Sequence, residues 1–359
     1  MSNALLTEEE VTLLRNELET AQNPLFFYDG DCDGLTSFLL LYRLHYRGKG
    51  IGLTSTARAL DEKFVRKVQE LQPDKIFILD IPTVTQEFID QTKKPTFWID
   101  HHPPLQRTNV HYFNPRLKDP EAYVPTSRMA WQVSQKEEDL WIATAGCMGD
   151  FHLPDFLDTF IAKYPQFLTQ KEDLPTMLFK RPVGRLVKFF FFIQKGPQAE
   201  VRRSVKVLTR IQSVEEIFQQ TTAQGKYLFK RFEQINQKYS VLLKQAKKAV
   251  TKNKLILFNY TEDQWSFTAN VANELSGLYP QKIVLIVRKK SGEMKCSLRG
   301  KKVSQPLQKA LLGIEGYGGG HPDACGAVIK EKDWESFLGQ FKKAIGEEEI
   351  INTGNNQYR

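Results

Sequence analysis

The chain has 359 residues, of which 41% are hydrophobic, and its formal net charge is +8. No stretch approaches the roughly 18 to 20 consecutive apolar residues of a membrane span, and the N-terminus lacks a basic region followed by an apolar one. The four cysteines are widely scattered, which excludes a disulfide framework and a zinc-ribbon pattern. We therefore expect a soluble, cytoplasmic protein without a membrane partner and with two domains.

The N-terminal segment begins with a helix signal. Thr7 and Glu10 have the spacing of a capping box at the start of the amphipathic stretch TEEEVTLLRNELETA, and Pro24 breaks that pattern. A helix is therefore expected before the first strand.

Three short apolar runs follow, and each ends in an aspartate. LFFYD ends at Asp29, KIFILD at Asp80 and TFWID at Asp100. Such runs are typical of parallel strands buried on both faces, and helical segments starting at Leu35 and Asp61 lie between them. This alternation predicts an α/β fold with a doubly wound, mostly parallel sheet.

The carboxyl ends of parallel strands meet along one crevice, where ligands bind. Asp29, Asp80 and Asp100 are therefore expected to lie close together. Asp150, which ends the small-residue stretch ATAGCMGD, is grouped with them. Any one of these acids could simply cap the next helix, but their recurrence favours a shared site.

The densest acidic stretch is YDGDCDGLTS, which holds Asp29, Asp31 and Asp33. Carboxylates this close repel one another unless a cation neutralises them. Further candidate ligands are Asp80, His101 and Asp150. Carboxylates with an imidazole suit Mn²⁺ or Mg²⁺ better than Zn²⁺, and two such ions sharing an aspartate can promote hydrolysis at phosphorus.

Two adjacent histidines follow the third apolar run in FWIDHHPP. Neighbouring side chains on an extended turn point in different directions, so His101 and His102 can have different functions. With His101 on a metal, His102 is expected to donate a hydrogen bond to a phosphate oxygen or to the leaving group.

These motifs resemble those of the DHH superfamily of phosphoesterases, in the branch of RecJ-type exonucleases and nanoRNases. Asp100-His101-His102 is the signature triplet, and DGDCDG, Leu79-Asp80 and Gly149-Asp150 resemble the other motifs. Relatives that cleave pyrophosphate or bisphosphate nucleotides usually carry a histidine near Phe27, so the phenylalanine favours a nuclease.

The resemblance also implies residue roles. Asp100 would orient a ligating histidine, and Asp100 and His102 are the expected catalytic residues. The implied ligands are Asp29, Asp31 and Asp80 for one ion, and Asp33, Asp80, His101 and Asp150 for the other.

The C-terminal third resembles the DHH-associated C-terminal domain. Its motifs are CSLRG, from Cys296, and GYGGGHPDACGA, from Gly316. The resemblance implies a glycine-rich loop that binds the phosphate and base of the substrate, and bare glycine backbone permits this close approach. The expected substrate-binding residues are Arg299, Gly318, Gly319, Gly320 and His321.

The segment between these regions is basic. Residues 171–250 hold 17 Lys and Arg against 6 Asp and Glu, a net charge of +11. Apolar residues spaced by three and four from Leu228 to Ala246 predict a long joining helix, whose lysines either follow a nucleic-acid backbone or form a solvated face. Phe189 to Phe192 are expected in the core or an interface rather than in a base-stacking surface.

The predicted organisation is a DHH catalytic domain at 1–155, a helical basic connecting region at 156–250, a smaller α/β nucleotide-binding domain at 251–345 and a polar tail at 346–359. The predicted function is a two-metal exonuclease, with Mn²⁺ expected and Mg²⁺ possible, that hydrolyses single-stranded RNA or DNA to nucleoside monophosphates. Two alternatives stay open: a nanoRNase or bisphosphate-nucleotide phosphatase limited to very short substrates, and a non-catalytic replication or repair scaffold. A replication or repair protein partner is compatible with catalysis.

Overall fold

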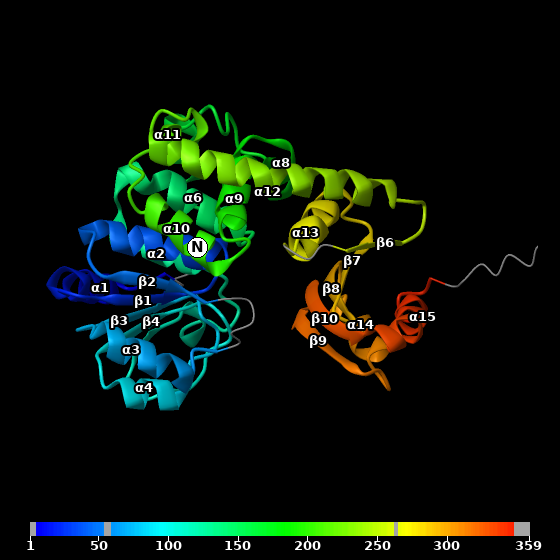
Figure 1. Ribbon diagram of the computed structural model, residues 1–359, viewed down its shortest axis with the longest axis horizontal. Coiled ribbons are helices and arrows are strands. Elements are labelled where there is room, and N and C mark those ends of the chain that lie inside the picture. Colours follow the sequence, from blue (N-terminus) through cyan, green and yellow to red (C-terminus); the bar gives the residue numbers. More distant parts are fainter. Residues whose placement is uncertain (1–4, 54–58, 262–264, 348–359) are drawn as a thin grey trace, which may run out of the picture. The chain divides into compact units, whose positions relative to one another are not determined.

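A computed structural model describes residues 5–53, 59–261 and 265–347. The chain forms two compact units, Met1–Gln234 and Ile235–Arg359, each with its own five-stranded sheet (Figure 1). The division falls within one long helix, α12, Ala223–Lys248. The finer division into catalytic, connecting and nucleotide-binding regions stays a prediction, and the tail lies outside the described residues from 348 onward.

The first unit contains the predicted parallel sheet. All its strand pairs are parallel, in the order β2-β1-β3-β4-β5. The three apolar runs are its central strands, and β2 is an additional edge strand whose exposed sequence KGIG gives no strand signal. The strands are β1 Leu25–Tyr28, β2 Lys49–Gly52, β3 Ile76–Leu79, β4 Thr96–Ile99 and β5 His111–Phe113.

Helices cover both faces of this sheet, which confirms the doubly wound arrangement. On one face, α3 (Val65–Leu71) and α4 (Gln86–Thr92) share a hydrophobic core with strand residues. On the other face lies α2 (Cys32–His45) (Figure 1). The rings of Phe26 and Phe77 stack at 5.2 Å between centroids. The strands are thus buried on both sides, as their continuous apolar sequences predict.

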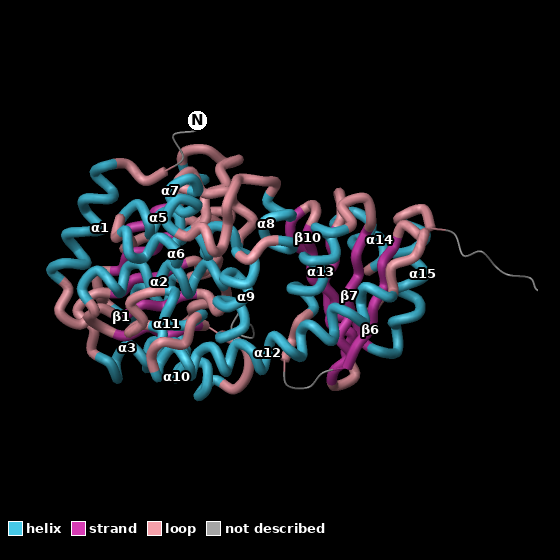
Figure 2. Tube along the Cα trace, turned by 90° about the horizontal axis from the view of Figure 1, so that it is seen from above, coloured by secondary structure: helices cyan, strands magenta, loops and turns pink. Residues whose placement is uncertain are grey.

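The first unit contains further helices, of which α1, α5, α6 and α9 contact α2 (Figure 2). The capping box of Thr7 and Glu10 starts α1 as predicted, and no helix among the described residues is long and apolar enough to cross a membrane. These helices are α1 Glu8–Thr20, α5 Thr126–Ser134, α6 Leu140–Gly149, α7 Leu157–Lys163, α8 Leu174–Lys180, α9 Val183–Ile193, α10 Gln198–Leu208 and α11 Val214–Phe218.

Two details of this unit concern its acidic residues. Asp150 follows a helix, because ATAGCMG is the end of α6 and Asp150 is its C-terminal cap. The second helix begins at Cys32 rather than Leu35, because the side chain of Asp31 caps it. The expected burial of the phenylalanine run is confirmed for Phe189, Phe190 and Phe192, which are 0% exposed.

The second unit contains a mixed sheet in the order β6-β7-β8-β10-β9. Helices α14 and α15 contribute to the core on one of its faces, and α13 packs against β7 and β8 (Figure 2). The glycine run 318–320, expected in a loop, lies in edge strand β9, since its backbone pairs with β10. The elements are β6 Leu255–Thr261, α13 Thr268–Leu278, β7 Ile283–Lys290, β8 Glu293–Arg299, α14 Ser304–Ala310, β9 Gly316–His321, β10 Ala324–Lys330 and α15 Trp334–Ala344.

Candidate metal centre

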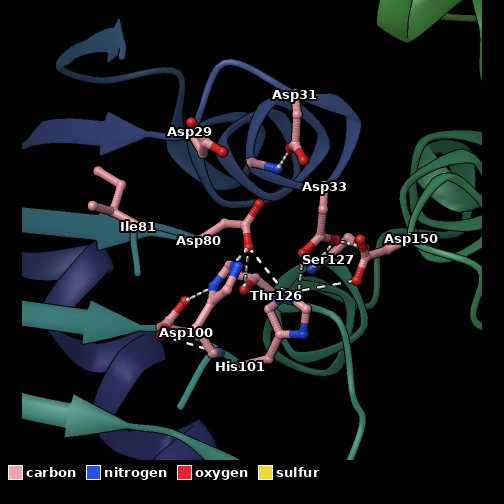
Figure 3. Close-up of polar contacts among 12 residues, drawn as sticks. Asp29, Asp31, Asp33, Asp80, Ile81, Asp100, His101, Thr126, Ser127 and Asp150 are labelled. Carbon is pink, nitrogen blue, oxygen red and sulfur yellow. Dashed lines mark hydrogen bonds and ion pairs between the residues drawn. The ribbon is translucent and has the colours of Figure 1, made fainter. Parts of the chain in front are cut away.

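Three aspartates mark the carboxyl edge of the parallel sheet (Figure 3). The backbone N–H of Asp29 donates to Leu79 O at 3.2 Å, and that of Asp80 donates to Ile99 O at 3.0 Å. The N–H of Asp100 likewise donates to Phe113 O, also at 3.0 Å. The strand pairing thus extends one residue past each strand and fixes the three acids side by side, as the sequence predicts.

Two glycines allow the tight turn that carries the other acids. A Cβ on Gly30 would stand 2.2 Å from Leu53 O, and a Cβ on Gly34 would stand 2.4 Å from Asp29 O. Only glycine permits such close backbone approach. The turn leads directly into α2, where Asp31 accepts a hydrogen bond from Gly34 N at 3.0 Å.

Asp33 lies in the first turn of α2 and is 1% exposed. The first N–H groups of α5 satisfy it: Thr126 N donates to Oδ2 at 2.8 Å, and Ser127 N donates to Oδ1 at 2.9 Å. The Ser127 hydroxyl also donates to Oδ1. A carboxylate at a helix N-terminus is stabilised by the helix dipole, so α5 orients Asp33 at the centre of the acidic group.

Asp80 has a φ of +60°, in the left-handed region that aspartate tolerates better than most residues. Its Oδ1 lies 3.3 Å from His101 Nε2, and that nitrogen lies 3.6 Å from Asp150 Oδ2. The His101 ring is therefore placed between two carboxylates from opposite sides of the site. Its Nδ1 is buried without a hydrogen-bond partner among the described residues.

Three groups of side chains have ligand atoms within 4.8 Å of one another. They are Asp29, Asp31 and Asp80; Asp33, His101 and Asp150; and Asp80, His101 and His102. The first group is the set expected for one ion, and the second holds three of the four residues expected for the other. Asp80 and His101 each occur in two groups, so neighbouring cations could share this centre.

Crowding of the acids changes their protonation. Burial, followed by the charges of Asp29 and Asp150, raises the pKa of Asp31 to about 7 from 3.8. Burial and neighbouring acids also raise the pKa of Asp33 and of Asp80 well above their usual value. Oxygen donors whose mutual repulsion is this strong, beside an imidazole, fit a divalent cation such as Mn²⁺ or Mg²⁺.

The signature triplet places its two histidines differently. Asp100 is 0% exposed, and its Oδ1 accepts a hydrogen bond from His102 Nδ1 at 2.8 Å. Asp100 thus orients His102 rather than His101, the histidine expected on the metal. Burial alone would lower the pKa of His102, but the hydrogen bond and charge of Asp100 raise it overall. His102 therefore retains its proton to higher pH than an ordinary histidine.

Several contributors to the site carry no motif in the sequence. Tyr123 donates its hydroxyl proton at 2.7 Å to Oδ2 of Asp150, and Asn114 donates Nδ2–H at 2.9 Å to the carbonyl of His102. The backbone donors at the start of α5 are equally invisible, because any sequence has N–H groups there. A tyrosine in a loop between a strand and a helix gives no signal of its own.

The Cys32 side chain packs against α6. Its thiol donates to Ala145 O at 3.4 Å, and a Cβ on Gly149 would stand 2.7 Å from its sulfur. Cys32 therefore fills space in the packing of α2 against α6.

The expected substrate-binding residues of the second unit lie on adjacent strands. Arg299 on β8 pairs with Ala324 on β10, which pairs with His321 on β9, so the three form one row across the sheet. The Arg299 side chain donates through Nε to Asn273 Oδ1 at 2.6 Å. His321 and Gly320 are exposed, and Gly319 has open space on its Cβ side.

Comparisons with known proteins agree with this description. Residues 256–347 match the model of the DHHA1 domain family. No curated protein sequence gives a significant match.

Solved structures resemble the chain over almost its whole length. RecJ from Thermus thermophilus in complex with Mn²⁺ gives a TM-score of 0.64 at 15% identity, covering 94% of this chain and 54% of that one. Exonuclease RecJ bound to manganese gives 0.59 at 15% identity, covering 97% of both chains. The DHH domain of a member of the s1p family of ribosomal proteins gives 0.65 at 13% identity, covering 96% of this chain and 93% of that one.

The chain thus spans about half the length of the Thermus RecJ, and at these identities the likeness concerns the fold. Both parts of the resemblance predicted from the sequence are confirmed by the DHHA1 match and the RecJ and DHH-domain structures. The chain therefore has the fold of the RecJ and DHH-domain structures, and its C-terminal part matches the DHHA1 domain family.

Proposed function

We propose that this chain is a two-metal phosphodiesterase that acts as an exonuclease, hydrolysing single-stranded RNA or DNA to nucleoside monophosphates. The observation that supports it most is the sharing of Asp80 and His101 between groups of ligand atoms within 4.8 Å. The carboxylate of Asp80 has two oxygens and can bridge two neighbouring cations, whereas the imidazole of His101 would bind one of them. Asp29, Asp31 and Asp80 would hold one cation, and Asp33, Asp80, His101 and Asp150 the other.

Bound cations would lower the pKa of a water molecule and stabilise negative charge on the phosphate oxygens. The residues of the chain have separate tasks. Asp100, as a carboxylate, can only accept from His102 Nδ1, so the proton on that nitrogen is fixed. Nε2 is then the nitrogen with which protonated His102 would donate to a phosphate or leaving oxygen. The raised pKa of His102 extends the pH range over which this donor stays charged.

In the second unit, we propose that strand β9 and Arg299 bind the substrate. The bare glycine backbone of residues 318–320, exposed at Gly320, lets a phosphate approach closely, and His321 and Arg299 stand in the same row of the sheet. The hydrogen bond from Arg299 to Asn273 would hold the guanidinium in place for a phosphate.

Two alternatives lead to different experimental results. A nanoRNase or nucleotide phosphatase has the same chemistry but accepts only very short substrates. A replication or repair scaffold binds nucleic acid or a protein partner without hydrolysis. The acidic groups described above support an enzyme, because a scaffold gains nothing from buried carboxylates that repel one another.

The test is hydrolysis of single-stranded RNA and DNA from dinucleotides to about thirty nucleotides, in Mn²⁺, Mg²⁺ or EDTA. The central variant is Asp80→Asn, because asparagine tolerates the positive φ that alanine would not. Asp90→Asn, on the exposed side of α4, is the matched control. We expect release of mononucleotides by the native protein and the control, and a loss of about 100-fold or more in Asp80→Asn.

The pattern of lengths distinguishes the alternatives. Cleavage restricted to substrates of about two to five nucleotides would favour the nanoRNase, whereas a groove for longer strands should accept ten or more. Binding without cleavage by the native protein, in every metal, would favour the scaffold.

A further inference from the structure

Phe151, which directly follows Asp150, has an unusual backbone conformation. Its φ is +55°, in the left-handed region that bulky side chains rarely adopt. Its side chain is also 42% exposed, so burial does not offset this strain. Strained residues that persist beside a functional centre often serve its mechanism, and this strain aims an apolar ring outward next to an expected ligand.

Other aromatic residues surround this position. Tyr123, also 42% exposed, donates its hydroxyl proton to Asp150, and its ring centroid lies 5.5 Å from that of His101. Phe179, from α8, lies behind Phe151 at 6.2 Å between ring centroids. We call Tyr123, Phe151 and Phe179 the aromatic rim. The rim lies wholly in the first unit, beside the acidic cluster.

We propose that Phe151 is a stacking surface for a nucleobase of the substrate nucleotide bound at the metal centre. This inference rests on the proposed function and extends it to a residue outside the ligand set. A phosphate held near Asp150 places its own nucleotide close to the next residue, whose Cα is about 3.8 Å further along the chain. Every base has a flat π-face, so a ring at this point would hold nucleotides without selecting a sequence.

Because φ is positive at this position, a glycine variant can separate the role of the ring from its effect on stability. Phe151→Gly removes the ring and relieves the strain, because glycine adopts this conformation readily. The melting temperature should therefore stay the same or rise, while kcat/KM for hydrolysis of the substrate falls. A residue with a merely structural role would show the opposite pattern, with a lower melting temperature.

Tyr46 provides a matched control. It also has a φ of +55° and is 45% exposed. It caps the C-terminal end of α2, and Asp31 caps the other end of this 14-residue helix. At about 1.5 Å per residue, the two ends are roughly 20 Å apart. Tyr46→Gly therefore makes the same chemical change far from the acidic cluster.

The experiment compares two short oligonucleotides of equal length, one with all bases and one that lacks the base at both terminal nucleotides. Hydrolysis is followed for the native protein, Phe151→Gly, Phe151→Trp and Tyr46→Gly, with melting temperatures in parallel. We expect kcat/KM of Phe151→Gly to fall about 10-fold on the complete substrate and hardly at all on the abasic one. Phe151→Trp should restore the rate, and Tyr46→Gly should match the native protein.

An equal loss on both substrates, or no loss on either, would overturn the stacking role. If the native protein hydrolyses both substrates at the same rate, stacking is wrong while the proposed phosphodiesterase stands. If the native protein hydrolyses neither substrate in any metal, the proposed function fails and the inference fails with it.

Discussion

At the scale of single residues, neighbouring strand-end aspartates have different surroundings. Asp80 lies 3.3 Å from His101 and near other acids, which is the setting of a cation ligand. Asp100, one strand further along, accepts hydrogen bonds from the side chain and the backbone of His102. The same residue type at equivalent strand ends is thus suited to hold a cation in one case and to orient a histidine in the other.

This difference predicts the effect of Asp100→Asn on the pH dependence of hydrolysis. Asp100 raises the pKa of His102, so the protonated form persists to higher pH, and its loss above the pKa should lower the rate. Removing the charge lowers that pKa, and the alkaline limb of the kcat profile should move to lower pH. A pH–rate profile with Asp90→Asn as control measures the shift. If the alkaline limb of the Asp100→Asn profile lies at the same pH as that of the native protein, His102 does not supply the proton.

At the scale of elements, the turn from β1 into α2 combines strand, cap and ligands in one short segment. Asp29 is the last residue to pair along β1, and Asp31 is the N-cap of α2. Asp33 accepts hydrogen bonds from the first N–H groups of α5. Gly34 makes this possible, because its missing Cβ leaves room for the backbone of Asp29. The positions of the carboxylates therefore depend on backbone packing as well as on their own side chains.

We predict that Gly34→Ala disturbs this turn. The added Cβ would stand 2.4 Å from Asp29 O, so the backbone must shift, at a cost of roughly 1 to 3 kcal/mol. Thermal unfolding in EDTA should show lower stability, and calorimetric titration should show weaker Mn²⁺ binding. Gly339→Ala, in α15 with no heavy atom within 4 Å of the added Cβ, should be neutral or slightly stabilising. Native Mn²⁺ affinity in Gly34→Ala would contradict this account.

Elements whose pattern is local could be predicted from the sequence. The apolar runs at Leu25, Ile76 and Thr96 are continuous because both faces are buried, and the strand ends that they predict bring three acids together. ATAGCMG has no such pattern: small residues fit the close packing of a helix as well as a strand, so the helix that ends at Asp150 could not be predicted from them.

The glycine run shows the same difficulty in the second unit. Gly318 to Gly320 have no side chains to show alternation, so the backbone pairing of β9 with β10 has no signature in the sequence. Contacts that depend on tertiary packing, such as the one from Tyr123 to Asp150, are also invisible there.

At the scale of the whole molecule, the two units have separate sheets and separate cores. All candidate metal ligands lie in the first unit, and the exposed glycine strand lies in the second. A ligand stabilises the elements that form its binding site. Unfolding these elements also releases the ligand, so it costs the binding free energy in addition. A cation should therefore affect the two units differently.

Hydrogen exchange followed by mass spectrometry measures this difference. At a Mn²⁺ concentration of about 100 times Kd, binding contributes about 2.7 kcal/mol to the stability of the native state. Amides in β1, β3 and the first turns of α2 and α5 should exchange more slowly with Mn²⁺ than in EDTA. Amides in β7, β8 and α15 should exchange at unchanged rates, because none of the groups of candidate ligands found among the described residues lies in their core.

The variant Asp80→Asn provides the control. In this variant, Mn²⁺ should no longer slow amide exchange in the first unit, and amides in the second unit should exchange at the native rates. Equal slowing in both units would mean that the cation binds elsewhere or that the units unfold together. Slowing confined to the first unit, and absent from the variant, would locate the cation at the carboxyl edge of the parallel sheet without any measurement of hydrolysis.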